Sequence, residues 1–243
     1  MQPDLDWVVI AANPYSGVGR NRGSVDALVQ ALVRRRLRAV TAWDPAERRA
    51  LLQRASASGR CRCVVAAGGD GTVADVINER AAAPLACLPL GTESVFARRF
   101  GFGADPEPLA RDIAAGRTWA MDLGRCGDRL FALMLTAGFD ADVCHRLAQL
   151  RAAGRRIRTG GRLRYVGPIL ESIRRYRYPS IELHADSAVH RCAHVFIFNT
   201  GAYGLCIPFA PCARCDDGLL DWVAFRRPGV LAALRYLDAV RRR

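Results

Sequence analysis

The sequence contains no lysine, and all of its 36 basic residues are arginine. The phosphate-binding loop of an ordinary P-loop NTPase needs a lysine that contacts the β- and γ-phosphates of the nucleotide. The absence of lysine therefore excludes that class of enzyme. The arginines outnumber the 23 acidic residues and give a formal net charge of +13. Such a charge favours a polyanionic partner, which nucleic acid, acidic lipid head groups or phosphates would each satisfy.

The sequence also has no long apolar run, and its first residues are not expected to form a signal peptide. No apolar run approaches the roughly 18 residues that a membrane-spanning helix requires. The opening stretch, MQPDLDWVVIAANP, carries acids where a signal peptide carries bases. We therefore expect a cytoplasmic protein whose nine cysteines are reduced. Cys212 and Cys215 form a C-x-x-C motif, but no second pair or histidine flanks it, so half-buried cysteines are a better interpretation than a metal–thiolate site.

In the first half of the chain, apolar runs of strand length alternate with helical patterns. Strands are expected at residues 7–12, 38–43, 63–67 and 85–90. Helices are expected from Ser24, from Asp44-Pro45 to about Ser58, over 74–83, over 93–100, and from Asp105 to about Gly116. Strands that are apolar throughout and alternate with helices predict a parallel sheet covered on both faces. Ligands of such sheets bind at the carboxyl ends of the strands, where this sequence is rich in Gly, Ser and Thr.

The pattern changes near Asp122. Segments at 129–139, 180–186, 190–204 and 218–225 have the composition of β structure. One basic helical stretch, roughly residues 143–178, interrupts them. We therefore predict an α/β domain over residues 1–122 and a β-rich domain over residues 123–243.

The third predicted strand ends in Gly68-Gly69-Asp70-Gly71-Thr72, which places one carboxylate among three glycines. Glycine lets a phosphate approach the backbone and tolerates positive φ, and the N-terminus of the following helix carries partial positive charge. A carboxylate repels phosphate, so Asp70 needs another role. It could order the turn, meet Mg²⁺ or accept a proton from an attacking hydroxyl. The alternative is an aspartate that caps the following helix.

This motif resembles the signature of the diacylglycerol kinase catalytic domain family, which sphingosine and ceramide kinases share and to which NAD kinases and phosphofructokinases are more distantly similar. Four further segments resemble family motifs, in family order and spacing, between Trp7 and Phe225. They are NPYSGVGR (13–20), LPLGTESVFARRFG (88–101), AGFDADV (137–143) and APCARCDDGLLDWVAF (210–225).

The resemblance implies an α/β nucleotide-binding domain, a β-rich lipid-binding domain and an active site between them. It also implies an ATP-dependent lipid kinase that uses Mg²⁺ to phosphorylate a hydroxyl of diacylglycerol, sphingosine or a related lipid. By similarity, the ATP-binding residues are Asn13, Pro14, Ser16, Gly17, Thr41, Gly68, Gly69, Asp70, Gly71, Thr72, Val73, Ala74, Asp75 and Thr92.

The remaining implied roles fall on single residues. Asp70 is the candidate catalytic residue. The Mg²⁺ site is implied at the backbone carbonyls of Arg214 and Leu219 and the carboxylate of Asp217. Asp142 matches an aspartate that contacts the amino-alcohol of the lipid in sphingosine kinases.

The sequence departs from the family pattern at several points. Ala74-Asp75 stands where the family has Asn-Glu, and Glu93 adds an acid beside the expected phosphates. The sequence ends at RYLDAVRRR, without the Leu-Asp-Gly-Glu motif whose carboxylates the family uses in catalysis. A catalytically impaired nucleotide- or lipid-binding member is therefore one alternative. A soluble-substrate kinase of the NAD-kinase type is another, which the Asp-Gly-x-Leu segment disfavours.

Residues 146–177 hold ten arginines and one acid, Glu171, with tyrosines interleaved. Arginines with aromatic residues also suit RNA, and a solvated helix face would have a similar composition. For a lipid kinase, peripheral contact with an anionic membrane surface is the better functional interpretation, because the substrate lies there. We therefore expect a lipid substrate and no nucleic-acid partner.

Overall fold

The computed structural model describes residues 6–14, 16, 21–91, 94–153, 163, 165–201, 203 and 209–241. The chain divides into two compact units, Met1–Ala132 and Leu133–Arg243. Each unit is described by itself. No helix among the described residues is long and apolar enough to cross a membrane.

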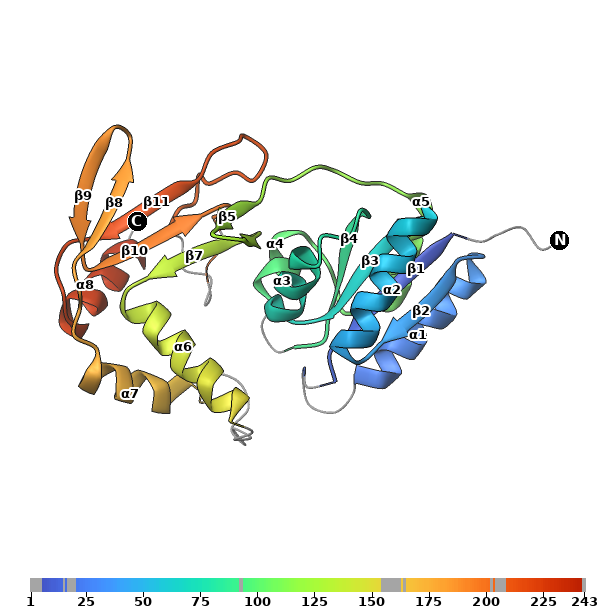
Figure 1. Cartoon of the computed structure of the whole chain (residues 1–243), viewed down its shortest axis with the longest axis horizontal. Helices are drawn as coiled ribbons and strands as arrows, with labels where there is room; N and C mark the ends of the chain where they lie inside the picture. The colour runs from blue at the N-terminus through green and yellow to red at the C-terminus, as the bar shows by residue number, and fades with distance from the viewer. Residues whose placement is uncertain are drawn as a thin grey trace. The chain divides into compact units, whose positions relative to one another are not determined.

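The first unit is built on a four-stranded parallel sheet in the order β2-β1-β3-β4 (Figure 1). A small antiparallel hairpin, β5–β6, follows it. The elements of this unit are β1 (Trp7–Ala12), α1 (Asn21–Arg34), β2 (Arg38–Ala42), α2 (Pro45–Ser58), β3 (Cys61–Gly68), α3 (Asp70–Asn78), β4 (Leu85–Pro89), α4 (Val95–Arg99), α5 (Pro106–Ala115), β5 (Gly124–Cys126) and β6 (Arg129–Phe131).

The central strands of the parallel sheet, β1 and β3, are buried on both faces over most of their length, which explains their apolar runs. Val8 and Ile10 of β1 pack into a core cluster with residues of α1 and α5. Val9 and Ala11 alternate with them and are fully buried as well, on the face that α2 and α3 cover. This arrangement, followed by a β-rich second unit, confirms the predicted fold class.

Local capping sets the ends of α2. The side chain of Asp44 accepts hydrogen bonds from the N–H groups of Ala46 (2.7 Å) and Glu47 (3.2 Å), and Pro45 occupies the first turn. Gly59 ends the helix with a left-handed φ of 64°. The helix was predicted from Asp44-Pro45 and expected to run to about Ser58, and this prediction is confirmed. The predicted cap of the preceding helix is wrong, because α1 begins at Asn21 and Ser24 lies inside it.

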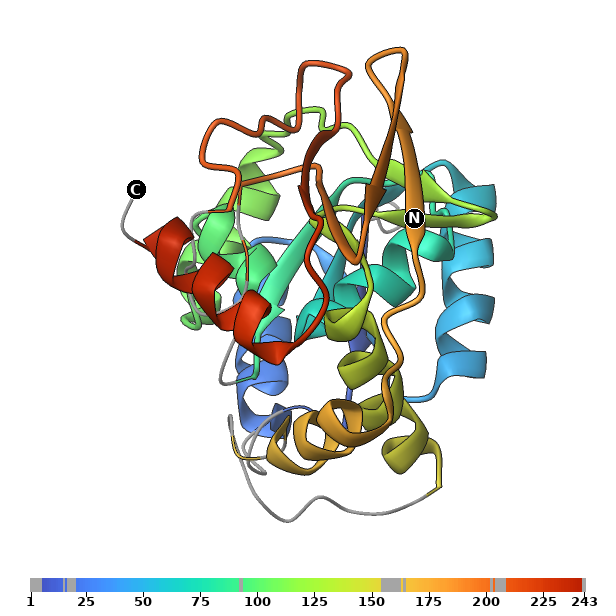
Figure 2. The ribbon, with the colours of Figure 1, turned by 90° about the vertical axis from the view of Figure 1, so that its left-hand side faces the viewer.

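The second unit contains a three-stranded antiparallel sheet in the order β11-β10-β7 and a separate hairpin, β8–β9. Figure 2 shows α7 lying across α6 in this unit and the orange hairpin extending beside β11. Its elements are β7 (Met134–Ala137), α6 (Phe139–Ala152), α7 (Val166–Arg175), β8 (Ile181–Ala185), β9 (Ala188–Cys192), β10 (His194–Phe198), β11 (Asp221–Phe225) and α8 (Val230–Arg241). Aromatic rings dominate its core, and those of Phe196 and Phe209 stack with centroids 5.0 Å apart.

One helix boundary and one whole helix in this unit differ from what the sequence predicted. The basic stretch forms two described helices, and the first of them begins at Phe139 rather than near residue 143. The early start has a physical reason, since Asp140 and Asp142 in its first turn favour a helix N-terminus. Gly138, directly before it, has a φ of 114°, and a Cβ there would lie 2.7 Å from the carbonyl oxygen of Ala193. The second difference is α8, for which the sequence analysis assigned no element.

Candidate phosphate-binding site

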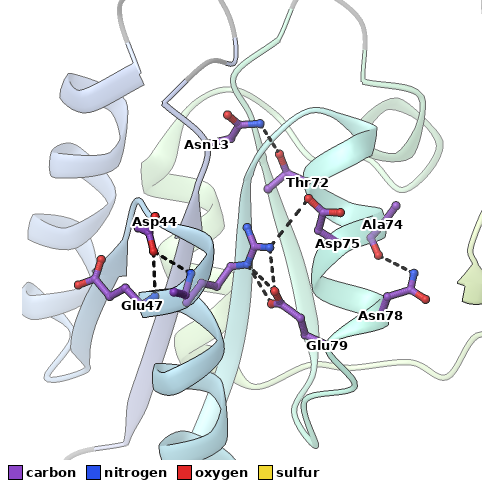
Figure 3. A network of polar contacts seen from close by, with 10 residues as sticks. Asn13, Asp44, Glu47, Thr72, Ala74, Asp75, Asn78 and Glu79 are labelled. Atoms are coloured by element: carbon purple, nitrogen blue, oxygen red, sulfur yellow. Dashed lines mark hydrogen bonds and ion pairs between the residues drawn. The ribbon is translucent and has the colours of Figure 1, made fainter. Parts of the chain in front are cut away.

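Four of the predicted ATP-binding residues converge at the carboxyl ends of β1 and β3. The Asn13 side chain donates a hydrogen bond to Thr72 Oγ1 over 3.2 Å, which joins the end of β1 to the first turn of α3 (Figure 3). The backbone N–H of Asn13 also donates to Ala67 of β3. A Cβ placed on Gly68 would lie 2.8 Å from Thr72 Cβ and 3.2 Å from Ser16 Oγ. The structure therefore brings Asn13, Ser16, Gly68 and Thr72 into one small region.

The glycines of this region are of two kinds. Gly68 is enclosed, and a side chain there would overlap Thr72. Gly69, Gly71 and Gly91 are open, because a Cβ on any of them would meet no atom within 4 Å. None of these glycines has a positive φ. None of them therefore uses the left-handed backbone that glycine permits, and Gly69 and Gly71 supply open space at the N-terminus of α3.

Asp70 does not cap its own helix. One carboxylate oxygen accepts the N–H of Val95 (3.0 Å), and the other accepts the N–H of Phe96 (2.9 Å) and lies 3.4 Å from Ser94 Oγ. Ser94 in turn accepts the N–H of Ala97 over 3.3 Å. These contacts satisfy the first three N–H groups of α4, which a helix leaves without internal partners. Asp70 thus ties the glycine turn to the N-terminus of α4.

The predicted residues further along α3 have structural contacts of their own. Val73 is buried in the core, and Ala74 accepts a hydrogen bond from Asn78. Asp75 is about half exposed and lies 3.9 Å from the guanidinium of Arg48 on α2. The stronger partner of Arg48 is Glu79, whose carboxylate it contacts at 2.7 Å and 2.9 Å.

The Arg48 side chain is buried, so its pairing with α3 is structurally important. A buried charge is tolerated when it is paired and hydrogen-bonded, and removal of one partner is then strongly destabilising. Figure 3 shows Asp75 and Glu79 turned toward the same guanidinium group. Sequence reasoning missed Arg48, because nothing in its local sequence distinguishes it from the many exposed arginines.

The other predicted nucleotide contacts lie near the same edge or outside the described residues. Thr41 is on β2, paired in register with Ile10 of β1, one residue from the carboxyl end of its strand. Pro14 lies in the turn after β1. Gly17 and Thr92 are outside the residues that the structure describes, as is Glu93.

Asp142, the predicted lipid contact, forms an ion pair within the second unit. Its carboxylate accepts hydrogen bonds from Arg146 at 2.7 Å and 3.3 Å. Burial would raise the pKa of Asp142, but the hydrogen bonds from Arg146 and Ser172 and the arginine charge outweigh it and hold the pKa below its usual range. Arg146 also donates to Ser172 on α7 over 3.1 Å, so this pair links α6 with α7.

The predicted metal-binding loop is exposed. Asp217 Oδ1 accepts the backbone N–H of Leu219 at 3.0 Å, and Gly218 between them has a φ of 73°. Arg214 forms an ion pair with Asp216, not with Asp217. That pairing raises the pKa of Arg214 and lowers the pKa of Asp216. Among the described residues, no three His, Cys, Asp or Glu side chains cluster in a way that could hold a metal ion.

A polar cluster in the second unit was not found from the sequence. Asp140 accepts hydrogen bonds from Thr136 (3.0 Å) and from the Tyr203 hydroxyl (2.9 Å). Burial, reinforced by Asp140, raises the pKa of Tyr203 far above its usual value. His194 is buried nearby, and burial lowers its pKa while the charge of Asp140 offsets part of that effect. Asp140 lies inside the AGFDADV segment (137–143), but its partner Tyr203 lies 63 residues away.

Comparison with known proteins adds the family. Residues 7–126 match the model of the diacylglycerol kinase catalytic domain, and residues 134–242 match that of the YegS C-terminal NAD kinase beta sandwich-like domain. The two matches together span most of the chain and follow one another in the order of the two structural units. The chain belongs to the family of YegS-like lipid kinases.

Individual relatives are similar over different lengths. A protein of Pseudomonas aeruginosa strain PAO1 named "Probable lipid kinase YegS-like" is 30% identical over 187 residues, which cover 74% of this chain and 59% of the relative. One of the same name from Pseudomonas fluorescens Pf-5 is 39% identical over 105 residues, covering 42% of this chain and 34% of the relative. The matched parts therefore span between about a third and three fifths of these two relatives.

A solved structure shows the same fold. It is described as the crystal structure of a diacylglycerol kinase from Bacillus anthracis str. Sterne. It superimposes with a TM-score of 0.68 at 21% identity and covers 98% of this chain and 79% of that chain.

Proposed function

We propose that this protein is an ATP-dependent lipid kinase that transfers the γ-phosphoryl group to a lipid hydroxyl. The proposal rests on the region that contains Asn13, Ser16, Gly68 and Thr72. This region lies beside Gly69 and Gly71, two open glycines at the start of α3. Phosphoryl transfer depends on positioning and charge neutralisation more than on covalent chemistry by the protein. A helix N-terminus with open backbone beside it provides both for a phosphate group.

Each part of this region has a proposed task. The phosphates of ATP would lie against Gly69 and Gly71, where no side chain obstructs the backbone. Asn13 would hold Thr72 in place through their hydrogen bond. Asp70 would position α4, because its carboxylate already accepts two backbone N–H groups of that helix. Its candidacy as the general base stays a prediction.

Mg²⁺ is a proposed cofactor, and the residues of the 214–219 loop have suitable chemistry. Carboxylate and backbone carbonyl oxygens are the hard ligands that Mg²⁺ prefers. Asp217 engages one carboxylate oxygen with Leu219 N–H, so its second oxygen could join the carbonyls of Arg214 and Leu219 around a cation. When bound, Mg²⁺ would neutralise negative charge near the reacting groups. Because the chain has no lysine, arginines and the α3 dipole would supply the remaining positive charge.

The second unit is proposed to bind the lipid, and Asp142 is its proposed polar contact. An amino-alcohol head group would have to compete with Arg146 for the Asp142 carboxylate. A diacylglycerol, which has no ammonium group, would leave that ion pair intact. The sensitivity of activity to Asp142→Asn therefore distinguishes the two lipid classes.

The direct test is transfer of labelled γ-phosphate from ATP to a panel of lipids in mixed micelles, with NAD as a soluble acceptor in a parallel reaction. Labelled lipid supports the proposal. Labelled NAD would favour the soluble-substrate alternative. ATP binding without transfer to any acceptor would favour a catalytically impaired binding protein.

The assignment of the glycine turn has its own test. Gly71→Val should abolish ATP binding measured by calorimetry, because the branched side chain would fill the open space above α3. Gly23→Val is the matched control, since Gly23 is also an open glycine near a helix N-terminus, in α1. Equal ATP affinity for both variants would refute the assignment of this turn.

A further inference from the structure

Helix α7 exposes an apolar face to solvent. Four large aliphatic side chains share this face, and they are Val166 (48% exposed), Ile169 (38%), Leu170 (61%) and Ile173 (44%). Their spacing of i, i+3, i+4 and i+7 places them on one side of a helix. Leu163, three residues before the helix, is 65% exposed as well. A helix of a globular domain normally turns such a stripe toward the core.

The opposite side of α7 explains why the stripe faces outward. The buried residues of this helix are Pro168 and Ser172. Ser172 is fully buried and accepts a hydrogen bond from Arg146 on α6 over 3.1 Å. This contact fixes the rotation of α7 about its axis. The helix therefore attaches to its unit through a small polar residue and a proline, and its hydrophobic side is left without a partner among the described residues.

Positive charge borders the apolar face. Arg174 and Arg175 lie in the last turn of α7, and Arg177 follows it, all three exposed. The one acid of the helix, Glu171, forms an ion pair with Arg175 at 2.6 Å. Exposed aliphatic side chains beside arginines are the composition of helices that lie in the interface of an anionic bilayer.

We propose that the face formed by Val166, Ile169, Leu170 and Ile173, here called the apolar stripe, inserts into the surface of an anionic bilayer. The adjacent arginines contact the lipid phosphates. Charge complementarity favours a bilayer over a second copy of this chain, because two such faces would bring their arginines together. The proposal deepens the proposed function, since a kinase with a lipid substrate must reach the bilayer surface, but vesicle binding can be measured without any phosphoryl transfer.

The test is cosedimentation of the whole protein with phosphatidylglycerol–phosphatidylcholine vesicles. Leu170→Gln/Ile173→Gln should lower the partition coefficient at least about tenfold, because two aliphatic side chains no longer leave water. Both residues are exposed, so the circular dichroism melting curve should not change. The matched control is Val33→Gln/Val189→Gln, two aliphatic residues that are 59% and 56% exposed elsewhere on the molecule. This control should bind within about twofold of the unaltered protein.

A salt series separates the two contributions to binding. Arg174→Gln/Arg177→Gln should flatten the fall in binding as salt rises, because exposed charges are screened. The apolar-stripe variant should keep the salt dependence and lose affinity at every salt concentration. Equal partitioning of the stripe variant and the unaltered protein would overturn the proposal. So would absence of vesicle binding by the unaltered protein, or a dimer that the stripe variant dissociates.

The outcomes also separate this inference from the kinase proposal. Stripe-dependent vesicle binding without phosphate transfer to any lipid would support the membrane surface and refute the kinase. The opposite outcome is transfer of phosphate to lipids in micelles together with normal vesicle binding by the stripe variant. It would support the proposed kinase function and refute the proposed insertion of the apolar stripe.

Discussion

Replacement of Asp70 by asparagine separates a structural role from a catalytic one. In the structure, both carboxylate oxygens accept backbone N–H groups of α4, from Val95 and Phe96. The carboxamide of asparagine keeps one acceptor oxygen and turns an N–H₂ group toward the other donor. One charge-assisted hydrogen bond is lost and a buried N–H is left without an acceptor, a change worth about 1–3 kcal/mol. We therefore expect Asp70→Asn to lower the free energy of unfolding by that amount.

Urea denaturation followed by circular dichroism measures the change. With a slope near 2 kcal/mol per molar, the midpoint should fall by roughly 0.5–1.5 M. Hydrogen exchange gives a local measurement, and the amides of Val95 and Phe96 should lose protection. Asp26→Asn, on the exposed side of α1, is the matched control and should leave the free energy of unfolding within about 0.5 kcal/mol of that of the unaltered protein.

A purely catalytic Asp70 predicts the opposite pair of results. Turnover would fall by about 10²–10⁴-fold with the loss of a general base, while the midpoint and the exchange protection of α4 stayed unchanged. That combination would refute the argument that Asp70 positions α4. A fall in both quantities would indicate that the capping contact is needed to shape the site.

Two further substitutions test the packing of each unit. Gly68→Ala should destabilise the first unit by about 1–3 kcal/mol and weaken ATP binding, because its methyl group would overlap the Thr72 side chain. Gly71→Ala places its methyl group in open space and should leave stability nearly unchanged in the same urea titration. In the second unit, burial lowers the pKa of His194, so the unfolded chain binds a proton there at a higher pH than the folded chain does. Stability should therefore fall as the pH drops below about 6.5. His194→Asn should remove that part of the decline when urea midpoints at pH 7.5 and pH 5.5 are compared. An equal change in midpoint between the two pH values for both proteins would contradict this expectation.

The sequence predicted the parallel sheet well because its signals are local. Apolar runs of strand length, the Asp44-Pro45 start of α2 and the Gly116 end of α5 each depend on neighbouring residues, and each is present in the structure. The glycine turn was located for the same reason. Its backbone conformation was not, because several conformations are compatible with glycine and the surrounding helix decides among them.

Contacts between distant segments were beyond sequence reasoning. The hydrogen bonds of Asp70 to α4 join residues that are 25 and 26 positions apart in the sequence. From the sequence alone, Asp70 fits equally well as a cap of the helix that directly follows it. The pairing of Arg48 with Glu79 spans 31 residues, and only the crossing of α2 over the sheet brings them together. The start of α6 is different. Its acids were visible in the sequence, but a predicted β segment that ran to residue 139 concealed them.

The contact between Asn78 and β6 has a consequence for how this protein behaves at high concentration. The Asn78 side chain donates to the Leu130 carbonyl and accepts from the Leu130 N–H, both at 2.9 Å. A primary amide has the same donor and acceptor as a peptide group, so this side chain occupies the place that one residue of a neighbouring strand would take. The β6 edge of the two-stranded hairpin is thus covered at Leu130 by α3, and an unpaired edge is where a second chain would add itself. Asn78 links α3 to the hairpin, and we expect it also to hinder the addition of a second chain at this edge.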